Sequence, residues 1–311
     1  MVRWNEGARE PAAARETRDV VPDFAALLDS VRGIRWPARS AVRGGIPGAH
    51  TSRMRGTSAE FTEYRPYRQG DDLGRIDWKL FARSDRAYIR LSNDRAILPT
   101  TFVLDASASM AFPVETNGKW KLAAQIAIGL AAVARSSADP VGLLIVRKGG
   151  TVQLPPRTRQ GVIHEMIRAV IENGPGGNEP LSASLTNATR ISGRVVLITD
   201  FLGDAEDLLS NAARAVVGAR ELHAIHVIAP EEIDPPRETL LVSDPESPDI
   251  RRPLTGDARD VYVSAYAAWR DRISHDWSDA GISFTAAIVG SEEPDHLIRR
   301  ITAPRGVAVS A

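Results

Sequence analysis

Two aspartates in this chain each follow a run of apolar residues, and two serines stand close to the first of them. Asp105 ends the run "FVLD", Ser107 and Ser109 follow at alternate positions, and Asp200 ends the run "VLITD". In an extended segment alternate side chains point to the same side, so three oxygen groups can converge. Carboxylates and hydroxyls are hard ligands that suit magnesium, manganese or calcium better than zinc.

The alternative role for Asp105 and the serines is to cap the helix that follows them. That helix is expected to begin near Lys119, about ten residues later, which places it too far for direct capping. In a doubly wound sheet, ligands bind beyond the carboxyl ends of the strands, where the strand order reverses. Since Asp105 and Asp200 both end apolar strands, the metal interpretation is favoured.

Two carboxylates at adjacent strand ends also interact with each other. Without a cation they repel, so we expect the pKa of one of them to be raised. On this argument Asp200→Asn should raise the melting temperature of the metal-free protein.

The elements that must position these residues are strands alternating with helices, from residue 100 onward. This order predicts an α/β fold with a doubly wound, mostly parallel sheet covered on both faces. Strands are expected at 100–107, 140–150, 193–201, 221–230 and 282–290, with a proline-containing edge strand at 151–158 and a hairpin at 239–254. Helices are expected at 119–137, 160–174, 180–192, 205–220 and 257–281, with a short helix closing the chain.

The part before residue 99 has a different character. Residues 1–20 are polar and without periodicity, which predicts a disordered tail. Residues 21–98 are expected to hold a helix at 22–34, an extended arm at 35–58 and a small β segment at 60–98. Residues 99–311 form the main domain.

Composition excludes several classes of function. The formal net charge is zero, which gives no overall attraction to nucleic acid or to an anionic membrane. There is no cysteine, so disulfides, thiolate nucleophiles and cysteine-zinc sites are excluded. The longest apolar run, 122–134, is too short to span a bilayer, and residues 1–20 do not resemble a signal peptide. We therefore expect a cytoplasmic protein without membrane insertion and without a nucleic-acid partner.

Motifs of known catalytic sites are missing. A phosphate-transferring aspartate hydrolase needs a second aspartate two residues after the first, and Ser107 occupies that position. No G-x-S-x-G motif is found. His223 and His226 lie three apart in an expected strand, so they point to opposite faces and are expected to be packing residues. We expect no catalytic residues.

Two segments resemble a known family. "DASASM" with the downstream "LITDF" is similar to the metal-ion-dependent adhesion site of von Willebrand factor type A domains. The block "EFTEYRPYRQGDDLGRIDWKLFARSDRAYIR" resembles the signature of DUF58, a domain of unknown function built on a type A domain. The resemblance covers roughly residues 45–300. It implies a von Willebrand factor type A or Rossmann-like fold, with Asp105, Ser107, Ser109 and Asp200 as metal ligands.

The resemblance is incomplete at one loop. Type A domains complete the site with a threonine, and the corresponding stretch here is "GPGGNEPLSASL". Asn178 or Glu179 takes the threonine's place, and either can offer an oxygen.

The resemblance also implies a function: a non-catalytic, metal-dependent adaptor working with a MoxR-type AAA+ ATPase to assemble or activate a client protein complex. The implied cofactor is a divalent cation, magnesium first, with manganese or calcium as alternatives. The competing function is a divalent-metal-dependent phosphohydrolase that uses the same Asp and Ser cluster.

The 60–90 block is expected to do one of two things, or both. It can hold the N-terminal arm to the main domain through ion pairs, or it can dock a partner. Its five large aromatic residues are expected to pack on the type A domain. The candidate docking residues are Arg65, Arg68, Asp71, Asp72, Arg75, Asp77, Trp78 and Lys79.

Overall fold

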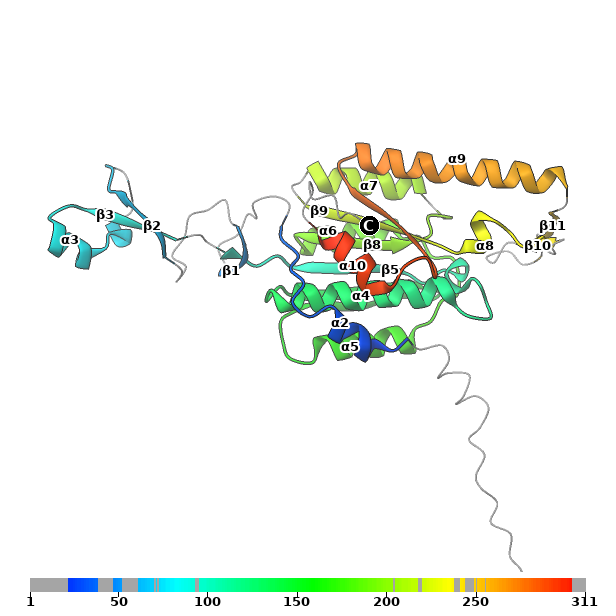
Figure 1. The fold of residues 1–311 in the computed structure, drawn as a ribbon, viewed down its shortest axis with the longest axis horizontal. Helices are drawn as coiled ribbons and strands as arrows, with labels where there is room; N and C mark the ends of the chain where they lie inside the picture. The colour runs from blue at the N-terminus through cyan, green and yellow to red at the C-terminus, as the bar shows by residue number, and fades with distance from the viewer. Residues whose placement is uncertain are drawn as a thin grey trace, which may run out of the picture.

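The computed structural model describes residues 22–38, 47–51, 61–69, 71, 73–92, 95–203, 205–217, 220–237, 241–243, 249, 251–254 and 256–303 (Figure 1). The tail expected at 1–20 and much of the arm expected at 35–58 lie outside these residues.

A six-stranded sheet forms the centre of the main domain. Its order is β12-β9-β8-β5-β6-β7, and neighbouring strands are parallel except for the antiparallel edge strand β7. The strands are β5 (Thr100–Asp105), β6 (Val141–Arg147), β7 (Gly150–Arg157), β8 (Arg194–Thr199), β9 (Glu221–Ile228) and β12 (Ser283–Ile288). The predicted α/β fold, including the proline-containing edge strand, is confirmed.

The strand order reverses between β5 and β8. From β5 the chain passes outward to β6 and β7, and from β8 it passes the other way to β9 and β12. Every residue of β5 and β8 is buried, as expected for central parallel strands. The reversal therefore places Asp105 and Asp200 side by side at the carboxyl ends of adjacent strands.

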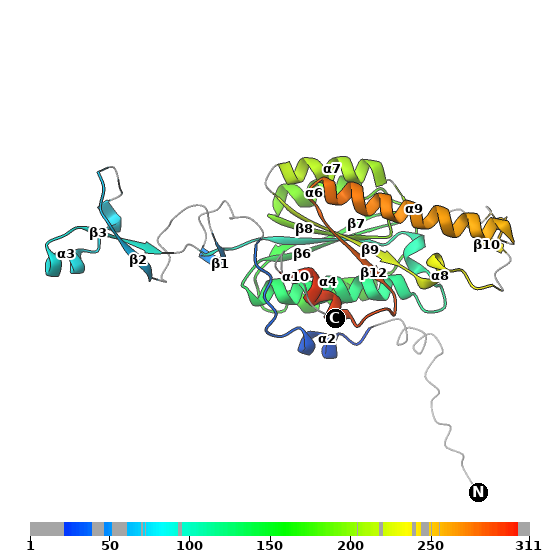
Figure 2. The same cartoon turned by 45° about the horizontal axis from the view of Figure 1, so that its top comes forward.

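Helices cover both faces of this sheet (Figure 2). One face carries α2 (Phe24–Ser30), α4 (Gly118–Ser136), α5 (Val162–Glu172) and α10 (Pro294–Thr302). The other carries α6 (Ser182–Ile191), α7 (Ala205–Val217) and α9 (Asp257–Asp279). The central helix α4 packs closely because Gly129 leaves room for α10. A Cβ atom there would lie 2.2 Å from Cδ1 of Ile298.

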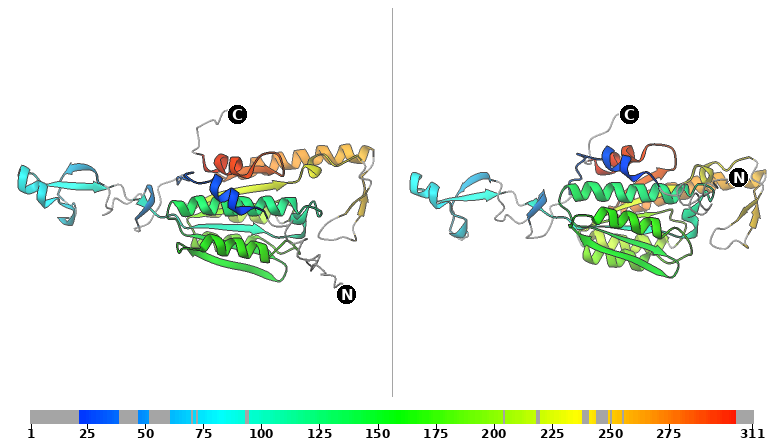
Figure 3. Two further views of the ribbon diagram at one scale, coloured as in Figure 1. Left: turned by 60° about the horizontal axis from the view of Figure 1, so that its bottom comes forward. Right: turned by 90° about the horizontal axis from the view of Figure 1, so that it is seen from below.

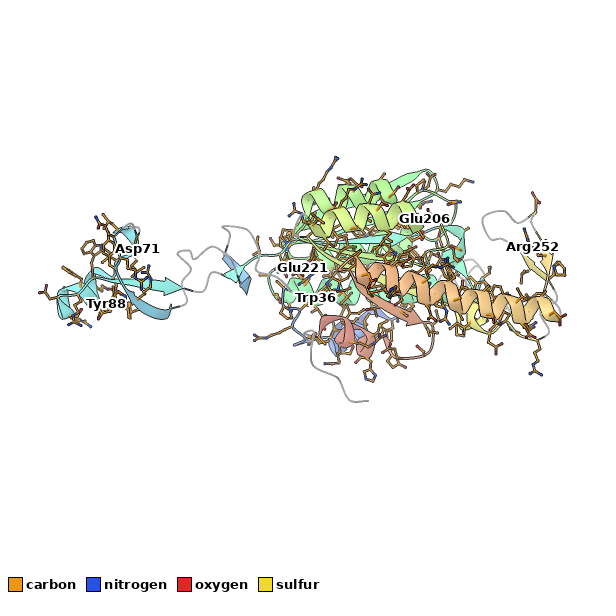
Figure 4. The ribbon with its side chains drawn as sticks, turned by 90° about the horizontal axis from the view of Figure 1, so that it is seen from above. Trp36, Asp71, Tyr88, Glu206, Glu221 and Arg252 are labelled. Atoms are coloured by element: carbon orange, nitrogen blue, oxygen red, sulfur yellow. The ribbon has the colours of Figure 1, made fainter. Side chains whose placement is uncertain are left out.

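The N-terminal segment is anchored at the amino edge of the sheet by Arg194, the fully buried first residue of β8. Its guanidinium bonds Glu221 at 3.1 Å, donates to the carbonyls of Trp36 and Pro37, and lies 4.1 Å from the centre of the Trp36 ring. The chain returns to the same edge at Leu98, whose N–H donates to Asp139. Both ends of the segment between Trp36 and Leu98 are thus fixed at one edge, where Figure 4 labels Trp36 and Glu221.

That segment carries the block that resembles the DUF58 signature. It contains β1 (Pro47–Thr51), β2 (Phe61–Pro66), η1 (Leu73–Arg75), α3 (Trp78–Ser84), β3 (Tyr88–Ser92) and β4 (Arg95–Ala96), with β2 paired to β3 and β1 to β4. We call the unit of β2, η1, α3 and β3 the signature block. It projects from the amino edge, away from the sheet, in every view (Figures 1 and 3).

The aromatic residues of this block were expected to pack on the main domain, and for Trp78, Tyr64 and Phe81 this expectation is wrong. Trp78 is 60% exposed, Tyr64 41% and Phe81 37%. They contact one another or their own hairpin, since Trp78 packs edge-on against Phe81 and Tyr64 against Tyr88. The block instead buries Ile76 and Ile89 in a small core of its own.

The opposite, carboxyl edge of the sheet carries short elements. η2 (Ala108–Ala111) follows β5, and α8 (Pro230–Ile233) follows β9; neither was predicted. The predicted hairpin is present as β10 (Leu241–Ser243) and β11 (Arg251–Pro253), and it lies at the far end from the signature block (Figure 1). None of the helices in the described ranges has the length and apolar character needed to cross a membrane.

Candidate functional site

Three of the predicted ligands meet in the loop after β5. Asp105 is buried, and its Oδ1 accepts the N–H of Ser107 at 2.8 Å while its Oδ2 accepts the hydroxyl of Thr199 at 2.6 Å. The hydroxyls of Ser107 and Ser109 lie 3.0 Å apart. Ser107 precedes η2, but its side chain makes no capping bond there. The side chains of Asp105, Ser107 and Ser109 thus lie together in this loop, and Ser107 does not cap η2.

The glycine-rich loop at 174–177 is fastened to the same place by backbone bonds. Gly176 donates to the carbonyl of Ala106 at 2.7 Å, and Ala108 donates to the carbonyl of Gly177 at 2.8 Å. Gly177 has φ +93°, and a Cβ atom there would lie 2.4 Å from Cβ of Lys148, so a glycine is needed. These backbone bonds bring the next two residues, Asn178 and Glu179, to the loop after β5 that holds Ser107.

A cavity of about 10 Å³ opens between these loops. It is lined by Asp105, Ser107, Asn178, Glu179, Leu181, Thr199, Phe201, Gly203 and Leu208. A space of this size holds about one water molecule, which is also the scale of a small ion. Because Asn178 and Glu179 both line it, both alternatives for the missing threonine remain open.

Asp200 is held differently from Asp105, by a buried ammonium group. Its Oδ1 accepts the N–H of Leu202 at 3.1 Å, and its Oδ2 lies 2.7 Å from Nζ of Lys119. The same Nζ lies 2.7 Å from Oε1 of Glu232 in α8. Sequence reasoning missed Lys119 and Glu232. One available signal was a lysine at the start of an otherwise apolar helix.

The electrostatics of the pair agree with the expectation of one raised pKa. Burial raises the pKa of Asp105 to about 6, and the charge of Asp200 acts in the same direction. The hydrogen bonds from Thr199 and Ser107 favour the carboxylate and oppose this rise. Asp105 is thus a buried acid close to a second one, surrounded by neutral donors.

The donor set suits a small, hard cation on the Asp105 side of the site. Asp105, Ser107, Asn178, Glu179 and Thr199 all carry side-chain oxygen atoms, and they line the cavity together with the apolar Leu181, Phe201 and Leu208. On the Asp200 side a positive charge is already in place, namely the ammonium of Lys119. Within the described residues, no group of three or more His, Asp or Glu side chains could hold a metal ion by itself.

The two strand histidines pack on opposite faces of β9, as predicted. His223 lies edge-on to Trp36 at 5.0 Å between ring centres, and His226 contacts Phe201 at 5.3 Å and Trp269 at 5.5 Å. Burial lowers the pKa of His226 to about 4, which keeps the ring neutral at pH 7. Neither histidine is placed to share a metal with the other.

The candidate docking residues lie in the signature block, which carries the labelled Asp71 and projects from the amino edge of the sheet (Figure 4). Arg65 binds both carboxylate oxygens of Asp71 at 2.8 Å, and this hydrogen bond holds the pKa of Asp71 below its usual value. The N–H of Arg68 also donates to Asp71. These contacts fold the turn of the block.

Asp77 caps α3 by accepting the N–H groups of Lys79 and Leu80, and it accepts the hydroxyl of Tyr64. Trp78 and the side chain of Lys79 are exposed. Asp72 and the side chain of Arg75 lie outside what the structure describes. The block is thus held by its own ion pair and cap, while Tyr64, Trp78 and Phe81 are exposed.

Comparisons with known proteins place the chain in a family. An uncharacterized protein of Mycobacterium tuberculosis is 29% identical over 252 residues, which cover 78% of this chain and 79% of that one. Among solved structures, an aerotolerance-related membrane protein from Bacteroides fragilis has a TM-score of 0.41 at 15% identity, covering 66% of this chain and 96% of that one. The SpRpn10 VWA domain has a TM-score of 0.39 at 12% identity, covering 68% and 100%. The family model "Protein of unknown function DUF58" matches residues 63–272, more than half of the chain, and the chain belongs to that family.

Proposed function

We propose that this protein is a non-catalytic adaptor whose carboxyl-edge site binds a divalent cation and, through it, a partner protein. The observation that carries the proposal is the small cavity lined by Asp105 and Ser107, at the point where the strand order reverses. Magnesium is the preferred ion because carboxylate and hydroxyl oxygens are its usual ligands, with manganese or calcium as alternatives.

The residues that would hold the ion are Asp105, Ser107, Ser109 and Asp200, together with Asn178 or Glu179. When bound, the ion supplies a Lewis-acidic position that a carboxylate of the partner can fill. Asp105 is fixed for this task by the bonds from Ser107 and Thr199. The loop at 174–177 holds the cavity open on its other side.

The proposed partner is an AAA+ ATPase of the MoxR type, acting with this chain on an unidentified client complex. Support for this partner comes from the family resemblance alone.

The test is binding of the purified chain to a purified MoxR-type ATPase, in millimolar magnesium and in EDTA. Wild-type protein is expected to bind in magnesium and to lose binding in EDTA. Asp105→Ala is expected to bind in neither, while Asp271→Ala, an exposed change on α9, should behave as wild type. Equal binding by wild type and Asp105→Ala would contradict a metal-bridged contact.

A second assay addresses the competing phosphohydrolase function. The chain is incubated with a general phosphoester and magnesium or manganese. We expect no turnover above the buffer rate. Turnover that disappears in Asp105→Ala would overturn the non-catalytic assignment.

A further inference from the structure

The buried ammonium group of Lys119 is a feature that the proposed adaptor function does not use. Lys119 is fully buried near the start of α4, between Asp200 and Glu232. An ion in such a place must be paired to be tolerated. The Nζ of Lys119 lies 2.7 Å from a carboxylate oxygen of each of these two acids. The group is therefore a permanent positive charge inside the site.

The two aspartates of the site differ in what neutralises them. Among the residues that the structure describes, those that donate hydrogen bonds to Asp105 are neutral, the N–H of Ser107 and the hydroxyl of Thr199, and Asp105 lines the cavity. Asp200 receives a full positive charge at 2.7 Å and is not part of the cavity wall. One carboxylate is thus open to an added cation, and the other already has one.

We infer that Lys119 is the resident cation of Asp200: it holds this carboxylate when no metal is bound, and a divalent cation must compete with it. The inference concerns the regulation of the metal site and rests on the proposed function. Its consequence is that the protein folds without metal, at the cost of a weaker affinity for the cation.

Glu232 gives the ammonium a second partner during this competition. Its Oε1 binds Lys119, while its Oε2 accepts the N–H of Ala229 at 2.8 Å and its carbonyl accepts the hydroxyl of Tyr262 at 2.9 Å. Glu232 is therefore fixed to both α8 and α9. When a divalent cation binds the carboxylate of Asp200 in place of Lys119, the ammonium group of Lys119 stays paired with Glu232.

The test is titration calorimetry of the full chain with magnesium, manganese and calcium in turn. Lys119→Met removes the competing charge at similar volume and should tighten binding by on the order of tenfold or more, as expected for one charge at a few ångströms. Glu232→Gln leaves the ammonium to Asp200 alone and should weaken binding several-fold. Lys121→Met is the control, because two positions along a helix lie on roughly opposite sides, and it should bind as wild type.

Thermal melts of the same proteins provide a second measurement. In EDTA, Lys119→Met should melt well below wild type, and saturating magnesium should restore more of its stability than it adds to wild type. If Lys119→Met does not fold, Glu232→Gln still tests the inference, since it keeps one ion pair and its predicted change has the opposite sign.

The outcomes separate this inference from the function on which it rests. Equal affinities in wild type, Lys119→Met and Glu232→Gln would overturn the competition and leave the metal site standing. If none of the proteins binds any of the three cations, the metal site itself is wrong, and the inference falls with it. Binding by Lys119→Met alone supports the inference and shows that wild type keeps the site closed to metal at rest.

Discussion

The two ends of the molecule use polar residues in opposite ways. At the carboxyl edge, Asp105, Asp200 and Lys119 are all buried, and each is held by groups from several elements of the sheet. In the signature block, Asp71 and Asp77 pair with residues close in sequence and fold a small exposed unit. The first arrangement fixes a site inside a rigid frame, and the second fixes a surface outside it. This difference is tested by making the same substitution at one residue of each end and comparing the stability of the two variants.

The largest contrast is expected for two tryptophans. Trp36 is 2% exposed and packs against Arg194, whereas Trp78 is 60% exposed. Trp36→Ala should lower the free energy of unfolding by about 3–5 kcal/mol. Trp78→Ala should change it by about 0.5 kcal/mol or less, as exposed positions usually do.

Thermal or denaturant unfolding of both variants measures this contrast. If Trp78→Ala were as destabilising as Trp36→Ala, the signature block would have to pack on the main domain, as the sequence suggested.

A smaller effect is expected when a carboxylate is neutralised at each end. Asp200→Asn removes one partner of buried Lys119 and should cost about 2–3 kcal/mol, below the usual range for a broken buried pair because Glu232 remains. Asp77→Asn should be nearly neutral, because asparagine also caps helices well. Melting curves in EDTA provide the comparison.

This expectation for Asp200→Asn reverses the one drawn from the sequence. Two facing aspartates alone predict that removing one charge stabilises the protein. With Lys119 present, the charge of Asp200 is already compensated, and its removal leaves a buried cation with one partner fewer. A higher melting temperature for Asp200→Asn in EDTA would mean that Lys119 does not hold Asp200 in solution.

That reversal illustrates what the sequence could and could not predict. Apolar runs and helical periodicity located the strands and helices of the main domain. This was possible because strands that are buried on both faces consist of nearly continuous apolar residues. The meeting of Asp105 with Asp200 followed from one topological rule. The pairing of Lys119 with Glu232 did not, because it joins residues far apart in the chain through a four-residue helix, α8, with no periodicity to detect.

The contact between Arg194 and Trp36 at the amino edge of the sheet could not be predicted either, because it leaves no local sequence pattern. The stacking of Arg194 on Trp36 joins a strand to an irregular segment far away in sequence. The exposed aromatic residues of the signature block were misjudged for a related reason. Their number predicted burial, but their local packing on one another was not visible in any pattern.

A pH-dependent effect is expected for Asp105. Its pKa of about 6 in the folded protein exceeds the ordinary 3.8, so the folded state binds the proton more tightly between these values. In the metal-free protein, stability attributable to this group therefore falls as pH rises from about 4 to about 6. Asp105→Asn lacks this loss and should be more stable than wild type by about 1–3 kcal/mol at pH 7.5, and equal to it near pH 4.

The comparison is made between variant and wild type at each pH in EDTA, because His226 changes stability in the opposite direction. Its folded pKa of about 4 lies below the ordinary 6.5, so its contribution is lost as pH falls through that window. Because His226 is present in both proteins, its contribution cancels when the stability of wild type is subtracted from that of Asp105→Asn. A difference that does not vary with pH would show that Asp105 titrates normally.

The smallest effect concerns the exposed carboxylate beside the cavity. Glu179 and Asn178 both line it, and Glu179 adds a charge that attracts a cation. Glu179→Gln should weaken magnesium binding by about tenfold or less, a change of about 1.4 kcal/mol at most. Asn178→Ala should have a smaller effect if Glu179 is the ligand, and a larger one if the amide oxygen of Asn178 binds instead. Titration calorimetry of these variants with magnesium decides between the two loop residues.

The control is Asp71→Asn, which removes the same charge from the signature block. It should leave the magnesium affinity unchanged, since that block lies at the other end of the molecule (Figure 1). Equal weakening by Glu179→Gln and Asp71→Asn would instead mean that overall charge, rather than the cavity, governs the affinity.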